Sequence, residues 1–187
     1  MIRSVAVLAW AIGLSQPGMP HETKARYARI VQQECKRADC DPFTLVALVH
    51  HESRWRPGAV GDGGRAIGLG QIHYQYYGAC RTDPDPIGNP GRDCLRTRQA
   101  LFDPEYNLRQ TMAQIEKWWA TCKQKTGRPA LMARWISGYG GYSRPPTVWC
   151  NQKRDSRGRW RDLPTPKPVQ DIIRYRRHLI RLARKRR

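Results

Sequence analysis

Acidic residues are scarce in this sequence, and no apolar segment is long enough to cross a membrane. The 187 residues include 15 Asp and Glu against 34 Lys and Arg, which gives a formal net charge of +19. This excess favours a polyanionic partner such as nucleic acid, anionic lipid or an acidic cell-surface polymer. The apolar run from Val5 to Leu14 has only ten residues, whereas a membrane-spanning helix needs about 20. The hydrophobic content of 40% is nevertheless sufficient for a folded core.

The sequence also lacks the spacings that bind zinc. No two cysteines are separated by two residues, which is the spacing typical of structural zinc sites. His51-Glu52 begins like a metalloprotease motif, but that motif requires a second histidine where Trp55 stands. His73 is isolated in the sequence. We therefore expect no metal and no cofactor.

The N-terminus has the pattern of an export signal, and the cysteine count agrees with it. Arg3 precedes the apolar run, as in signal peptides; the alternative is a buried N-terminal helix. An even number of cysteines, six, favours disulfides and an oxidising compartment. The simplest pairing joins sequence neighbours: Cys35 with Cys40, Cys80 with Cys94, and Cys122 with Cys150. Residues 1–20 are therefore predicted to be a signal peptide, and the protein to be exported to the periplasm or cell envelope.

Helical periodicity dominates the rest of the chain. Apolar residues recur at helical spacing over residues 22–36, 42–52, 104–122, 131–136 and 169–183. Two of these helices begin with Asp-Pro, at Asp41 and Asp103, where the aspartate caps the helix and proline fits its first turn. Pro57-Gly58 is expected to end the second helix, and Gly127 with Pro129 the third.

The remaining stretches are rich in proline and glycine and show no strand series or internal repeat. Residues 80–94 are expected to form a loop, and residues 145–168 an extended connection. The predicted fold class is therefore mainly α, with a single domain over residues 21–182 and a basic tail at 183–187.

One acidic side chain, Glu52, lies on an apolar helix face. It follows Leu48 by four residues and Val49 by three, so it shares the stripe that faces the core. Apolar surroundings and the end of a helix both disfavour a carboxylate, so we predict a raised pKa for Glu52. A second carboxylate, Asp62, stands in the Gly-rich loop that follows; its alternative role is turn formation.

The order of motifs around Glu52 resembles that of soluble lytic transglycosylase catalytic domains. The matching segments are Glu52-Ser53, Gly68-Leu69-Gly70-Gln71-Ile72, the helix start Asp103-Pro104-Glu105-Tyr106-Asn107-Leu108, and the turn at Ser137-Gly138. The resemblance covers residues 22–182 and implies a lysozyme-like fold with a Gly-rich active-site loop or small hairpin. It also implies cleavage of the β-1,4 bond between N-acetylmuramic acid and N-acetylglucosamine in peptidoglycan. Glu52 would be the single acid/base, and the product a 1,6-anhydro sugar.

The resemblance further implies substrate contacts. Gln71 corresponds to the family's substrate-contacting glutamine, and Ser53 is expected to position Glu52 or to contact sugar; a structural role is the alternative for each. The family's Ala-Tyr-Asn-x-Gly motif is altered here to residues 134–138, Arg-Trp-Ile-Ser-Gly. Trp135 is expected to replace the tyrosine, with core packing as its alternative, and Tyr139 to supply the missing hydroxyl.

Two other functions stay open at this point. One is a lysozyme-type hydrolase, with Asp62 activating water. The other is a non-catalytic basic protein that binds the envelope or nucleic acid, because residues 174–187 include eight Arg or Lys and no acid. We expect peptidoglycan strands as the main partner and anionic envelope polymers or lipids as partners of the C-terminal helix. No specific nucleic acid is expected.

Overall fold

The computed structural model describes residues 4–126, 132–141, 143, 145 and 147–186, without the side chains of 132–135. Contacts within the chain divide it into two compact units, Met1–Thr111 and Met112–Arg187, and each is described by itself. The predicted mainly helical fold class is confirmed. Over the described ranges, no helix is both long and apolar enough to span a membrane.

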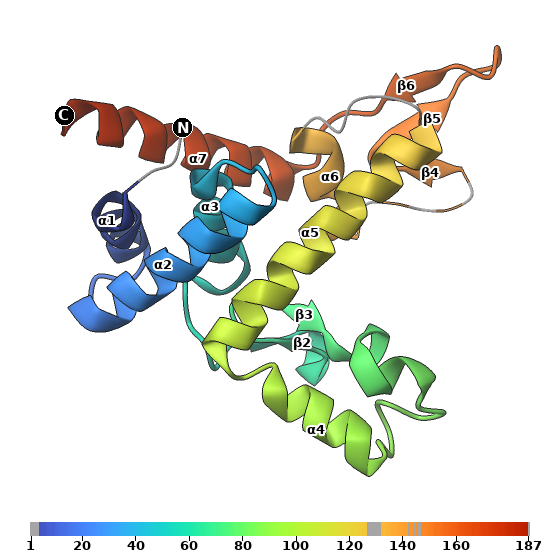
Figure 1. Ribbon diagram of the computed structural model, residues 1–187. Helices are drawn as coiled ribbons and strands as arrows, with labels where there is room; N and C mark the ends of the chain where they lie inside the picture. Colours follow the sequence, from blue (N-terminus) through green and yellow to red (C-terminus); the bar gives the residue numbers. More distant parts are fainter. Residues whose placement is uncertain (1–3, 127–131, 142, 144, 146, 187) are drawn as a thin grey trace. The chain divides into compact units, whose positions relative to one another are not determined.

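Three helices pack together at the start of the first unit (Figure 1). They are α1 (Val5–Ser15), α2 (His21–Arg37) and α3 (Pro42–Ser53). Ser4 caps α1 by accepting a hydrogen bond from the backbone N–H of Val7 at 3.4 Å. The apolar run thus forms a helix whose Leu8 and Ile12 side chains are fully buried. Export of the protein remains a prediction.

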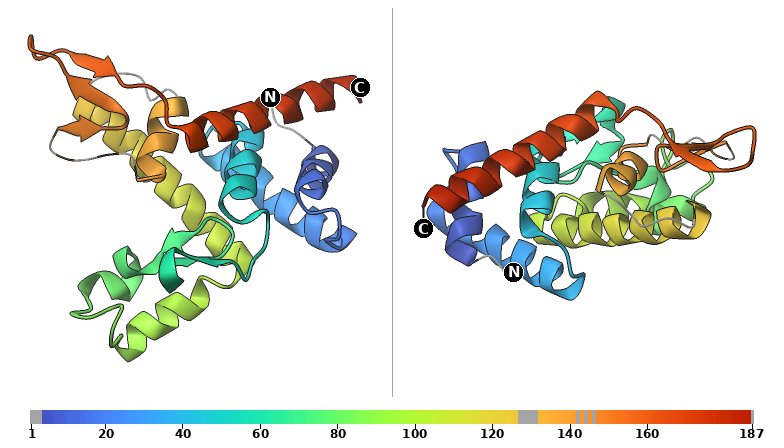
Figure 2. Two further views of the ribbon diagram at one scale, coloured as in Figure 1. Left: turned by 180° about the vertical axis from the view of Figure 1, so that it is seen from behind. Right: turned by 90° about the horizontal axis from the view of Figure 1, so that it is seen from above.

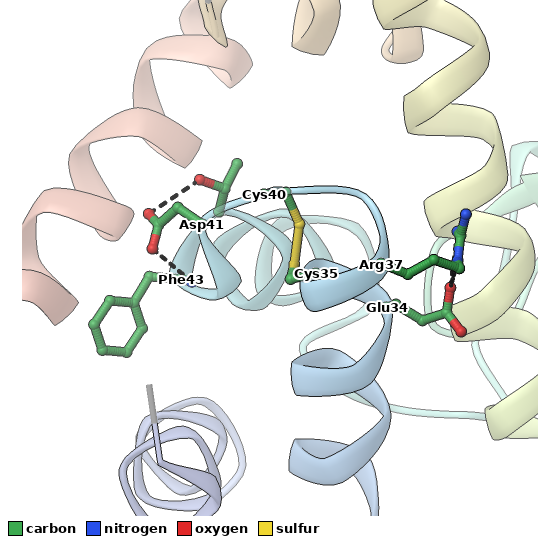
Figure 3. The surroundings of a disulfide bond; sticks show 7 residues. Glu34, Cys35, Arg37, Cys40, Asp41 and Phe43 are labelled. Carbon is green, nitrogen blue, oxygen red and sulfur yellow. Dashed lines mark hydrogen bonds and ion pairs between the residues drawn. A yellow bond between two sulfur atoms is a disulfide. The ribbon is translucent and has the colours of Figure 1, made fainter. Parts of the chain in front are cut away.

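The joint between α2 and α3 is fixed by a disulfide and a cap (Figure 3). Cys35 and Cys40 are bonded across the turn. Asp41 accepts hydrogen bonds from the backbone N–H of Phe43 at 3.4 Å and from the hydroxyl of Thr44 at 3.3 Å. The predicted Asp-Pro helix start is confirmed, because Pro42 is the first residue of α3.

A small antiparallel sheet follows α3, with strands β1 (Val60–Gly61), β2 (Ala66–Ile67) and β3 (Ile72–His73) in the order β1-β2-β3. A short 3₁₀ turn, η1 (Asp62–Gly64), joins the first two strands. Val60 lies opposite Ile67, and Ala66 lies opposite His73. This sheet confirms the prediction of a Gly-rich loop or small hairpin.

The chain then passes through two 3₁₀ turns into a short helix. These elements are η2 (Tyr74–Tyr76), η3 (Gly78–Thr82) and α4 (Arg92–Ala100). The Cys80–Cys94 disulfide joins η3 to α4, which lie side by side (Figure 2, left). The predicted loop between these cysteines is therefore shorter than expected, because regular structure occupies both of its ends.

Helix α5 (Pro104–Thr126) begins in the first unit and continues in the second. Asp103 accepts a hydrogen bond from the backbone N–H of Tyr106 at 2.7 Å, so the second predicted Asp-Pro start is also confirmed. The expected stops at Gly127 and Pro129 lie outside the described residues. The second unit also contains α6 (Met132–Tyr139) and α7 (Lys167–Lys185), which contact each other.

The prediction of an extended connection over residues 145–168 is wrong. That segment forms a second antiparallel sheet of β4 (Val148–Trp149), β5 (Gln152–Arg154) and β6 (Trp160–Asp162). The Asn151 side-chain amide donates to the backbone carbonyls of Leu163 and Pro164 at 2.8 and 3.2 Å. The third disulfide, Cys122–Cys150, anchors this sheet to α5. All three disulfides join the cysteine pairs that the sequence predicted.

Candidate active site

Glu52 lies near the end of α3, four residues after the buried Leu48 and three after the buried Val49. The pKa of Glu52 is raised from 4.5 to about 7, mainly because its carboxyl group is partly withdrawn from water and to a smaller extent because of the negative charge of Asp62. The predicted raised pKa is confirmed. Near neutral pH the group is thus present in both protonation states, as a residue that acts first as acid and then as base requires.

Helix α3 ends at Ser53, earlier than the Pro57-Gly58 stop that the sequence predicted. Arg54 and Trp55 have left-handed φ angles of 51° and 61°, a conformation unfavourable for residues with a side chain. Trp55 is fully buried and stacks on Tyr27, with ring centroids 6.0 Å apart. This packing compensates for the strained backbone and fixes the direction in which the chain leaves Glu52.

Ser53 is buried, and its hydroxyl donates a hydrogen bond to the carbonyl of Val49 at 3.3 Å. Its own carbonyl accepts a hydrogen bond from the Arg56 guanidinium at 3.0 Å. Both polar groups of Ser53 therefore stabilise the end of the helix that carries Glu52. This is the structural role that the sequence left as an alternative; contact with sugar remains a prediction.

Asp62 pairs with His73 across the small sheet, at 2.7 Å between Oδ2 and Nε2. The Gln75 amide donates to His73 Nδ1 at 3.2 Å, which leaves Nε2 as the nitrogen that carries hydrogen toward Asp62. Tyr76 is 71% exposed and lies parallel to the His73 ring, with centroids 6.3 Å apart. In the sequence His73 stands alone, but in the fold it lies beside Asp62, because the pairing of the strands brings the two residues together.

The side chain of Gln71 stabilises the loop between β2 and β3 through hydrogen bonds. Its side-chain amide donates to the carbonyls of Gly68 at 2.9 Å and Ala59 at 3.3 Å. Its Oε1 lies against Gly61, where an added Cβ would collide with it. The contacts that the structure gives Gln71 are therefore structural, and its predicted contact with substrate remains a prediction.

Asn107 on α5 holds the other side of this loop. Its Oδ1 accepts a hydrogen bond from the backbone N–H of Gly70 at 2.8 Å. Its Nδ2 donates to the carbonyls of Ile67 at 3.0 Å and Leu101 at 2.8 Å. The side chain is completely buried, so two solvent-excluded hydrogen bonds attach the β2–β3 segment to α5, and the third attaches the end of α4.

The sequence predicted that Asn107 lies at the start of a helix, but it did not predict the hydrogen bonds of its side chain. A usable signal was present, because asparagine is a weak helix former and here stands beside the apolar Leu108 in the first turns of a strongly amphipathic helix. Position 70 must be glycine for a steric reason, because an added Cβ would collide with Thr111.

The two remaining predicted site residues belong to α6 in the second unit. The side chain of Trp135 lies outside the described residues. Tyr139 is half-buried at the end of α6, and Ile136 is buried in the core. Gly138 packs against the ring of Trp118, where an added Cβ would approach to 2.6 Å. Glu52, Ser53 and Gln71 thus belong to the first unit, and the roles of all five predicted site residues, including Trp135 and Tyr139, remain predictions.

The family model for the transglycosylase SLT domain matches residues 29–143, which is more than half of the chain. The matched segment includes Glu52, Asp62, Gln71 and Asn107 as well as α6. No curated protein and no solved structure matches the chain.

Proposed function

This chain belongs to the transglycosylase SLT family of the lysozyme-like superfamily, which acts on peptidoglycan, and on that premise we propose that it is a lytic transglycosylase. It cleaves the β-1,4 bond between N-acetylmuramic acid and N-acetylglucosamine and releases a 1,6-anhydro product. The observation that supports this proposal best is Glu52, a half-buried carboxyl group near the end of α3 whose pKa is raised to about 7.

The proposed reaction uses Glu52 twice. Protonated Glu52 donates its proton to the glycosidic oxygen as the bond to C1 of the N-acetylmuramic acid residue breaks. The C6 hydroxyl of the same sugar then attacks C1, and the Glu52 carboxylate accepts its proton. The proton balance closes without water, and the enzyme returns to its starting state.

A specific observation favours a second candidate, hydrolysis. Asp62 acts electrostatically on Glu52 and pairs with His73 at 2.7 Å. A carboxylate near the acid is what a hydrolase needs to activate water. In the transglycosylase, by contrast, Asp62 only helps to keep Glu52 protonated.

The mass of the products distinguishes the candidates. Purified sacculi are digested with the protein, and the soluble muropeptides are weighed. Anhydro ends support the transglycosylase, reducing ends support the hydrolase, and an absence of products supports a non-catalytic protein. Glu52→Gln should abolish product release, whereas Glu22→Gln, which removes an exposed carboxylate on α2, should not. Full activity of Glu52→Gln would place the catalytic acid elsewhere.

The proposal includes an envelope location and a role for α7. Four exposed arginines, Arg174, Arg177, Arg181 and Arg184, line a surface groove of about 700 Å³ together with Ile173 and Ile180. Arginines interleaved with apolar residues suit anionic lipids or envelope polymers. Sedimentation with anionic but not with zwitterionic vesicles is expected; preferential binding to a DNA duplex would favour the nucleic-acid alternative.

Export is proposed from the signal-like N-terminus and the disulfides. Intact-mass measurement of the protein from an expressing bacterium should show the loss of about residues 1–20. Retention of α1 in the mature protein would instead show that its buried face is part of the functional fold.

A further inference from the structure

A groove on α4 has the composition of an anion-binding site that the proposed cleavage reaction does not use. It has a volume of about 510 Å³ and is lined by Arg92, Leu95, Arg96, Arg98, Gln99 and Phe102. Leu95 is 46% exposed there, so the groove offers apolar surface beside its three guanidinium groups. A ligand that fits must carry negative charge and short apolar groups together.

The positive charge of this groove is only partly neutralised. Arg96 pairs with Asp93 at 3.3 Å, but both side chains are more than 70% exposed, and such a pair is weak. Within the part of the chain that the structure describes, no carboxylate lies within ion-pair distance of Arg92 or Arg98. The buried Nε of Arg98 has no hydrogen-bond partner there either.

The acidic residues of the preceding loop are occupied by backbone groups. Asp83 accepts a hydrogen bond from the N–H of Gly91 at 2.8 Å. Asp85 accepts one from the N–H of Gly88 at 2.8 Å. These carboxylates shape the loop that leads into α4 and leave the arginines of the groove available for a ligand.

The groove is attached to the segment that follows β3. The Cys80–Cys94 disulfide fixes α4 to η3, and the Arg98 guanidinium lies over the ring of Tyr74 at 5.5 Å. Tyr74 directly follows His73, the partner of Asp62. A ligand bound on α4 would therefore be held in a fixed position relative to the sheet that carries Asp62.

We propose that the α4 groove binds the acidic peptide stems that peptidoglycan strands carry, an inference that rests on the proposed function. Guanidinium groups bind carboxylates through paired, charge-assisted hydrogen bonds. Leu95 and Phe102 supply apolar surface for alanine methyl groups. The neutral sugars of the strand need no such concentration of positive charge. The groove thus recognises the stem while Glu52 acts on the strand.

A binding measurement tests this proposal independently of catalysis. Stem peptides released from sacculi by an amidase are titrated into the full-length protein and followed by calorimetry. Arg92→Gln/Arg96→Gln should weaken binding about tenfold, since charge-assisted hydrogen bonds are lost. The matched control, Arg29→Gln/Lys36→Gln on α2, removes the same charge from exposed positions and should change binding less than about twofold. No binding to wild-type protein, or equal weakening by both variants, would overturn the proposal.

Kinetics separate the groove from the cleavage site. On peptide-bearing strands the Arg92→Gln/Arg96→Gln variant should show a KM raised about tenfold with kcat unchanged. On strands stripped of peptides it should match the wild type. Equal loss on both substrates would contradict stem recognition, as would binding of a glycerol phosphate polymer in place of the peptides. If neither strand is cleaved by the wild type, the proposed function fails, and the calorimetric result alone decides the role of the groove.

Discussion

The hydrogen bonds of Asn107 allow a quantitative test of how the loop between β2 and β3 is held. Asn107→Leu keeps a side chain of similar size but removes the partners of three buried backbone groups, those of Gly70, Ile67 and Leu101. Each unpaired buried group costs about 1–3 kcal/mol. We expect a total loss of about 3–9 kcal/mol for the three groups, which is a large part of the stability of an ordinary domain.

Asn107→Asp gives a sharper result because it alters only one end of the side chain. The retained oxygen still accepts from Gly70, while the new one faces the carbonyls of Ile67 and Leu101 at the present 3.0 and 2.8 Å. The folded protein therefore favours the protonated acid, and the pKa of the new carboxyl group rises above its unfolded value of about 3.9. As the pH rises past the unfolded pKa of about 3.9, the unfolded chain binds fewer protons than the folded one. The free energy of unfolding of Asn107→Asp therefore decreases as the pH rises.

Urea unfolding followed by circular dichroism, at pH 4 and pH 7, measures this effect. Relative to wild type at each pH, Asn107→Asp should be about 2 kcal/mol less stable at pH 7 than at pH 4. The deficit of Asn107→Leu should be the same at both values. An Asn107→Asp variant that is equally stable at both pH values, or more stable at pH 7, would refute the reasoning.

Three further results are expected around the same site. The pKa of Glu52 in the folded protein lies near 7 rather than 4.5, so ionisation of Glu52 destabilises the wild type at high pH. Glu52→Gln should therefore be more stable than wild type at pH 8, by at most about 3 kcal/mol, and equally stable at pH 4. Urea titration at the two pH values checks this. Asp62→Asn should lower the pKa of Glu52 and move the alkaline limb of the pH–rate profile to lower pH, whereas an unchanged limb would show that Asp62 has no influence. Gly70→Ala should cost about 1–3 kcal/mol in thermal unfolding, because its Cβ meets Thr111, and Thr111→Ala should restore part of that loss.

The sequence predicted those parts of the fold whose signals are local. The capping aspartates Asp41 and Asp103 and the amphipathic face of α5 were sufficient to place the long helices. The raised pKa of Glu52 followed from its position on the apolar stripe of α3, without knowledge of any partner. Sequence proximity was also sufficient for the disulfides, because every cysteine is bonded to its neighbour along the chain.

The sequence could not predict features that depend on contacts between distant segments. The strands β4–β6 have two or three residues each, too few to show an alternating pattern. Helix α4 buries only Cys94 among its nine residues, so it has no apolar stripe to identify it. His73 meets Asp62, and Asn107 meets Gly70, only after strands and helices have packed. The register of a two-residue strand pair is not encoded in local composition.

The neighbour-to-neighbour order of the disulfides has a consequence for how the protein matures. Cys35–Cys40 and Cys80–Cys94 close loops within the first unit, and Cys122–Cys150 closes one within the second. A chain entering an oxidising compartment from its N-terminus presents these cysteines two at a time, in the order in which they pair. On the proposed export route, vectorial oxidation by a simple thiol oxidase would therefore yield the native bonds directly. On that route, the native disulfides would form without correction by a disulfide isomerase.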